Sequence, residues 1–93
     1  ESGESFKRMN KVLSKSFPNE FTSPLAYIKV SRIIAAACNV GEGQNKWQQA
    51  KPEQLKLRNE IQKNIELIAD LCPNTGECIS KAISKAKNYL PTA

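Results

Sequence analysis

Three cysteines, Cys38, Cys72 and Cys78, are the residues whose side chains could form or exchange covalent bonds in this chain. Cys72 and Cys78 flank the turn CPNTGEC, and two thiols this close together in a small chain favour a disulfide formed in an oxidising compartment. We expect this local pair, with Cys38 bonded to Cys72 or Cys78 as the alternative. Either pairing leaves one thiol that could link two copies into a homodimer, and an exposed Cys78 would suit that bond better than a buried Cys38.

Catalytic and metal-binding chemistry is restricted by the absence of histidine from the chain. Without it the usual acid–base group at neutral pH and the commonest metal ligand are missing, and Ser/His/Asp and Cys/His nucleophile arrangements are excluded. The cysteine spacing matches neither a C-x-x-C redox motif nor the usual paired zinc motif, and no glycine-rich phosphate loop occurs. We therefore expect no catalytic residue, no metal and no cofactor, in a protein that is not an enzyme.

Lysines at helical spacing and a single tryptophan are the remaining candidates for binding. The formal net charge is +5, and eleven of the fourteen basic residues are lysine, which favours anionic partners. The candidate binding residues are Lys7, Lys11, Lys15, Lys81, Lys85 and Trp47. Each lysine row can also be interpreted as a solvated helix face, and the indole either covers one end of the core or anchors an interface.

Hydrophobic periodicity predicts that four helices position these residues, at about 5–17, 24–39, 52–72 and 76–90, in one domain covering 1–93 with residues 1–4 frayed. The second of these segments is apolar in almost every direction around a helix, which is typical of a helix buried on all sides. It is too short to span a bilayer. We expect an all-α fold, a small bundle of about four helices around this buried central helix, stapled by a disulfide.

The size, charge and helix content together suggest how the protein acts. The chain starts at Glu1 rather than Met, which indicates a processed product or an excised piece of a longer chain. Secretion is favoured because a chain this small gains most from a disulfide. In this overall format the chain is similar to small secreted helical effectors, such as salivary proteins of blood-feeding arthropods, and the resemblance implies action on host tissue or immune cells.

We therefore expect a secreted, non-enzymatic interaction protein that binds a protein receptor or an anionic surface through its basic helix faces and Trp47. One alternative is a small carrier with an apolar ligand in a cavity between the helices. The other is a basic helical protein that binds membranes or nucleic acid.

Overall fold

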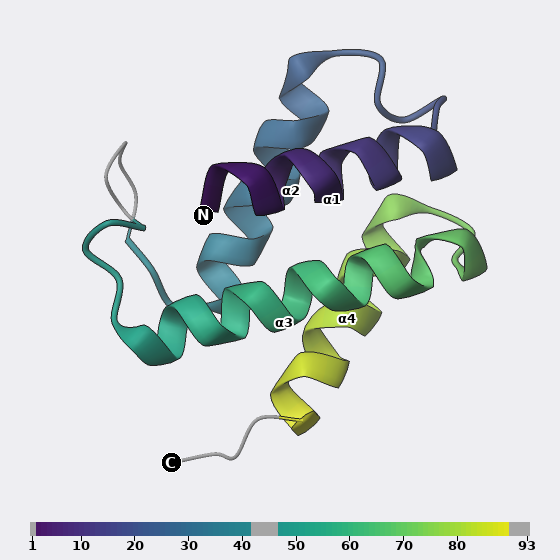
Figure 1. The fold of residues 1–93 in the computed structure, drawn as a ribbon. Helices are drawn as coiled ribbons and strands as arrows, with labels where there is room; N and C mark the ends of the chain where they lie inside the picture. The colour runs from purple at the N-terminus through teal and green to yellow at the C-terminus, as the bar shows by residue number, and fades with distance from the viewer. Residues whose placement is uncertain (1, 42–46, 90–93) are drawn as a thin grey trace.

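The computed structural model describes residues 2–41 and 47–89, which are all-helical apart from turns and loops (Figure 1). The helices are α1 (Ser2–Ser16), α2 (Pro24–Ala37), α3 (Pro52–Ile68), the short 3-10 helix η1 (Ala69–Leu71) and α4 (Thr75–Tyr89). The predicted all-α class is confirmed, and the helices form a compact globule. Residues 2–4 are helical rather than frayed, while residues 1 and 90 lie outside the described part of the chain.

The turn between α3 and α4 differs from its prediction at both ends. The expected helix 52–72 instead changes to the tighter η1 at Ala69 and ends before Cys72, whose backbone is extended (ψ 146°). The following Pro73 explains this, because a residue that precedes proline is driven out of the helical conformation. Asn74 then caps α4, since its side-chain Oδ1 accepts a 2.8 Å hydrogen bond from the backbone N–H of Glu77.

The junction between α2 and α3 fixes the position of α2. Asn39 adopts the left-handed conformation (φ 60°), and the Val40 N–H donates to the Ala35 carbonyl at 3.0 Å in a Schellman motif that ends the helix. The side-chain Nε2 of Gln54, in the first turn of α3, donates to the carbonyls of Cys38 at 3.2 Å and Asn39 at 2.8 Å. The two carbonyls that directly follow α2 are thereby tied to the start of α3.

The central helix of the fold is α3, so the predicted central position of α2 is wrong. Ile61 and Ile65 of α3 are 0% exposed, and α3 packs against α1, α2 and α4. By contrast, α2 buries one side only, and Leu25 on its other side is 65% exposed. An apolar helix at the edge of a small bundle can bury only the face that meets its neighbours.

The directions of the helices follow from contacts at their ends. Ser16 of α1 donates to Asp70 Oδ1 at 2.7 Å, and Phe6, near the start of α1, lies beside Arg58 of α3. These contacts make α1 and α3 parallel neighbours, joined by the crossover through α2 (Figure 1). The next pair, α3 and α4, is antiparallel, with Asn64 donating to the Ala82 carbonyl at 3.3 Å.

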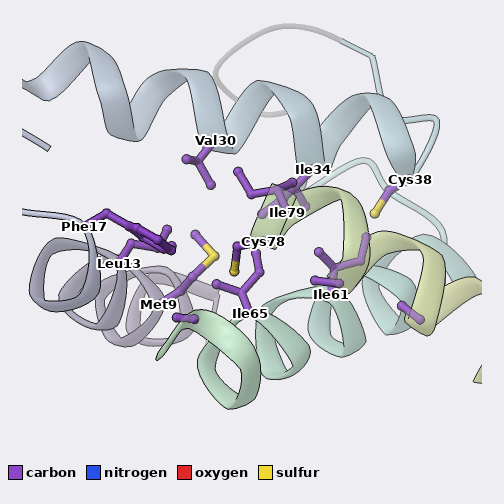
Figure 2. Packing of buried hydrophobic residues seen from close by; sticks show 13 residues of the cluster. Met9, Leu13, Phe17, Val30, Ile34, Cys38, Ile61, Ile65, Cys78 and Ile79 are labelled. Carbon is purple, nitrogen blue, oxygen red and sulfur yellow. The ribbon is translucent and has the colours of Figure 1, made fainter. Parts of the chain in front are cut away.

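The core lies where these four helices meet. Figure 2 shows Val30 and Ile34 pointing from α2 toward Ile79 of α4 and the side chains of α3. The fully buried apolar side chains are contributed by all four helices: Met9, Leu13, Ile34, Ile61, Ile65, Cys78, Ala82 and Ala86 are each 0% exposed. The two alanines let the α4 backbone approach α3 closely. α2 packs against both of these helices, so they support it from its buried side.

Candidate functional site

The outer face of α2 carries large apolar side chains that the fold leaves in water. Leu25, Ile28 and Ile33 are 65%, 45% and 44% exposed. At 100° per residue these three side chains share one half of the helix, opposite Val30 and Ile34, which are buried. Clustered aliphatic side chains on a folded surface mark an interaction site more often than scattered ones do.

A groove runs between this face and the beginning of α4. Its volume is about 410 Å³, and it is lined by Glu20, Phe21, Ser23, Leu25, Ala26, Lys29, Val30, Ile33, Thr75, Gly76 and Ile79. Val30 and Ile79 are each 2% exposed and form its apolar base. We use the name α2 groove for this groove together with the exposed face of α2, which adds Ile28 and Arg32.

The charges around the α2 groove are predominantly positive. Lys29 and Arg32 are exposed on the apolar face, and neither has an ion-pair partner among the described residues. The carboxylate of Glu20 is engaged at the opposite edge, where its two oxygens accept from the Thr75 N–H at 3.3 and 3.2 Å. There it faces the positive end of the α4 dipole, and the two cations outnumber this single carboxylate around the α2 groove.

The structure does not bring the two predicted lysine rows together. Lys7, Lys11 and Lys15 are exposed on α1, and Lys81 and Lys85 are exposed on α4. The central helix α3 packs against both α1 and α4, and α4 crosses α3 at a steep angle in Figure 1. Lys81 also forms a 3.6 Å ion pair with Glu77 on its own helix. The two rows therefore form no continuous basic surface.

Trp47 is placed against the core rather than projecting from it. The indole is half-buried, and its ring centroid lies 6.2 Å from that of Phe6 and 4.9 Å from the guanidinium carbon of Arg58. Arg58 is only 5% exposed, and its Nη2 donates to Asn59 Oδ1 at 3.1 Å. Burial lowers the pKa of Arg58. The two aromatic faces therefore replace the hydration that the buried cation has lost.

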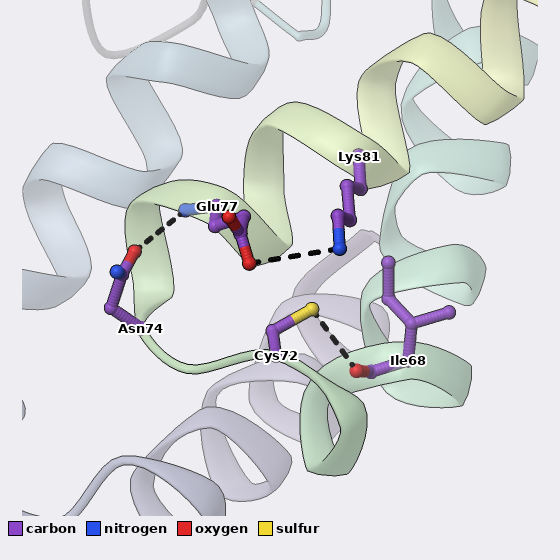
Figure 3. A network of polar contacts seen from close by, with 5 residues as sticks. All are labelled: Ile68, Cys72, Asn74, Glu77 and Lys81. Atoms are coloured by element: carbon purple, nitrogen blue, oxygen red, sulfur yellow. Dashed lines mark hydrogen bonds and ion pairs between the residues drawn. The ribbon is translucent and has the colours of Figure 1, made fainter.

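The cysteines lie in two separate places, with Cys38 after the end of α2 and with Cys72 and Cys78 around the turn between α3 and α4. Cys72 and Cys78 lie 4.1 Å apart with both thiols free, and the Cys72 thiol donates to the Ile68 carbonyl at 3.3 Å (Figure 3). Cys78 is 0% exposed, so it lacks the exposure that a bond to a second copy would need. Burial, followed by the neighbouring Cys72, raises the pKa of Cys78 to about 12.

Cys38 lies too far away for the alternative pairings. Its carbonyl accepts from Gln54 in the first turn of α3, whereas Cys72 follows the far end of that helix, more than about 20 Å along the axis. Cys38 is 3% exposed, and burial raises its pKa to about 11 despite the opposing charges of Arg58 and Lys87. A thiol this buried is poorly placed for a bond to a second chain.

Sequence reasoning missed Leu25, Ile28 and Ile33 as surface residues, because an apolar pattern all round the helix indicated full burial. The available signal was the position of the two cations, since Lys29 and Arg32 fall on the same side of α2 and mark the side that faces water. Within the described ranges, no three cysteine, aspartate or glutamate side chains lie close enough together to hold a metal ion.

The comparisons with known proteins add no family to this geometry. No helix in the described part of the chain is both long and apolar enough to cross a bilayer. No family model, curated protein or solved structure matches the chain. The α2 groove is therefore selected as the candidate site by its exposure, shape and charge.

Proposed function

We propose that this chain is a non-enzymatic interaction protein that binds a partner protein through the α2 groove. The observation that carries the proposal is the exposure of Leu25, Ile28 and Ile33 on a helix whose other face is buried. Apolar side chains held in water by a rigid frame gain free energy when a partner covers them, at roughly 25 cal/mol per Å². The frame itself supplies the preorganisation that such binding needs.

The geometry favours a protein partner over a small carried ligand. The volume of about 410 Å³ falls within the range of ligand pockets, but a carrier encloses its ligand. Here Leu25, which forms one wall, is 65% exposed and stays in water. A surface that can cover both the groove and the outer side of α2 buries these side chains more completely than a small molecule inside the groove.

The dispersed lysines have a role in this proposal that does not require a single patch. A net charge of +5 attracts acidic partners over distances of about a Debye length and raises their association rate. The lysines of α1 and α4 then act through the field of the whole protein, while the α2 groove determines which partner stays bound.

We also propose that the protein is secreted and acts with Cys72 and Cys78 joined by a disulfide. Their 4.1 Å separation requires only a small movement to reach the bond length of about 2.05 Å. The bond would clamp the end of η1 to the first turn of α4, which forms one side of the α2 groove. It would leave Cys38 buried as a free thiol.

Selection from a displayed library of helical and extended peptides tests the proposed surface without assuming a partner. We expect selected peptides to lose binding to Ile33→Glu and Leu25→Glu. They should keep binding to Ser84→Glu, which changes the net charge equally at an exposed position of α4. Circular dichroism establishes that each variant is folded. Peptides that bind Ile33→Glu and the unaltered protein equally would show that the surface lies elsewhere.

A further inference from the structure

We infer that the occupant of the α2 groove is an acidic amphipathic helix of a partner protein, an inference that rests on the function proposed above. It is carried by the spacing of the apolar side chains along α2, by the two unpaired cations among them, and by the consequence of those cations for self-association. None of these features depends on the lysine rows of α1 and α4.

The shape of the groove matches a helix. Leu25 and Ile33 are separated by eight residues, which is about 12 Å along the helix axis. Two turns of a docked helix cover this length, and they present apolar anchors at i, i+3, i+4 and i+7. The buried side chains of Val30 and Ile79 form the base between α2 and α4. The other common mode, addition of a strand, needs an open sheet edge, and the described residues contain only helices and turns.

The charge of the occupant follows from Lys29 and Arg32. Lys29 lies one helical turn from both Leu25 and Ile33, and Arg32 lies one turn from Ile28. A helix that buries the apolar side chains must place its flanking residues over these cations. Carboxylates there would form ion pairs at the edge of the contact, whereas basic flanking residues would be repelled. Glu20 does not reverse this preference, because it is a single carboxylate at the opposite edge of the groove, where it accepts from the Thr75 N–H.

The same cations disfavour a second copy of this chain. A twofold contact is isologous, so each side chain near the axis meets its own counterpart. Lys29 and Arg32 lie near the middle of the exposed face, and a contact centred there would bring four positive charges together. Two chains that each carry +5 also repel one another at long range. An acidic partner removes both costs.

Two synthetic helical peptides with identical leucine anchors test the inference. One carries glutamates at its flanking positions and the other carries lysines, and binding is followed by the fluorescence anisotropy of a label on the peptide. At about 50 mM salt we expect the acidic peptide to bind at least about tenfold more tightly, with the difference shrinking at about 500 mM. Lys29→Glu should abolish the preference, because it leaves one carboxylate beside the one remaining cation, Arg32. Lys56→Glu, an equal change of charge at an exposed site on α3, should change it far less.

The outcomes separate this inference from the function it rests on. Equal binding of both peptides, lost for both in Ile33→Glu, would overturn the acidic helix and leave the α2 groove as the binding surface. Acidic-peptide binding that survives Ile33→Glu would overturn both. A concentration-dependent dimer in sedimentation, abolished by Ile33→Glu, would identify a second copy as the occupant. Failure of both peptides to bind would also overturn the inference, and the library selection would then decide the proposed function alone.

Discussion

Two adjacent isoleucines on α2 provide a sharp test of which face of this helix is buried. Ile34 is 0% exposed and Ile33 is 44% exposed. Ile34→Ala should destabilise the protein by about 3 kcal/mol, because a fully buried side chain loses its transfer free energy and leaves a cavity. Ile33→Ala removes the same atoms from a half-exposed site, where about half of the 0.8 kcal/mol per methylene applies and no cavity forms. We expect a loss of about 1 kcal/mol there.

The difference of about 2 kcal/mol is the quantity to measure, since the higher helix propensity of alanine, about 0.4 kcal/mol, affects both variants equally. Urea unfolding followed by far-ultraviolet circular dichroism reports it, provided that the slopes of the three transitions agree. In a domain of this size the two variants should melt about 10 °C apart. Leu25→Ala, at a 65% exposed position, should cost less than about 1 kcal/mol. Equal losses for the two isoleucines would mean that α2 is buried all round and that the α2 groove does not exist.

Three further predictions concern the buried groups. Arg58→Ala should lower the free energy of unfolding by about 2–4 kcal/mol and shift Trp47 fluorescence to longer wavelength, because it removes the buried side chain that the indole covers. An unchanged spectrum would contradict the stacking. Oxidation should lower the intact mass by two hydrogens, join Cys72 to Cys78 in peptide maps and stabilise the fold by about 2 kcal/mol, whereas a bridge containing Cys38 would refute the geometry. The neutral Cys38 thiol should contribute stability in full below its ordinary pKa of 9.0 and lose that contribution as the pH rises toward about 11, so unfolding of Cys38→Ala should be less sensitive to alkaline pH than that of the unaltered protein.

Helix positions can be predicted well from this sequence where proline marks the boundary. Pro24 and Pro52 occupy the first positions of α2 and α3, as expected for a residue whose missing N–H costs nothing there. The end of α3 was harder to predict. The apolar pattern continues to Cys72, but the effect of Pro73 on the preceding backbone ends the helix earlier.

Periodicity could not predict which helix is the most deeply buried, because a helical wheel describes one helix and not its neighbours. α3 has a conventional polar side, yet Gln62 and Asn64 from it are 2% and 6% exposed, since α1 and α4 cover α3 from two directions. α2 is more apolar but meets fewer neighbours, so part of its apolar surface remains outside. The surplus of aliphatic residues that indicated a central helix is therefore the feature that produces the candidate site.

The contact between Trp47 and Arg58 was also beyond sequence reasoning. The two residues lie on different segments, and a lysine-rich chain gives no indication of which cation will be buried. Their 4.9 Å approach depends on α1 bringing Phe6 to the same place. The indole that was a candidate interface anchor thus packs against Phe6 and Arg58, and we propose the aliphatic side chains on α2 as the binding surface instead.

Mapping the contact surface of the bound acidic peptide by nuclear magnetic resonance tests the central claim most directly. Backbone amide shifts of the isotope-labelled protein would be followed during titration with the peptide, with the basic peptide as the matched control. We expect the perturbed amides to cluster at residues 20–33 and 75–79, which contribute the lining of the α2 groove. Perturbations confined to the lysine rows of α1 and α4, with the α2 amides unmoved, would contradict binding through this surface.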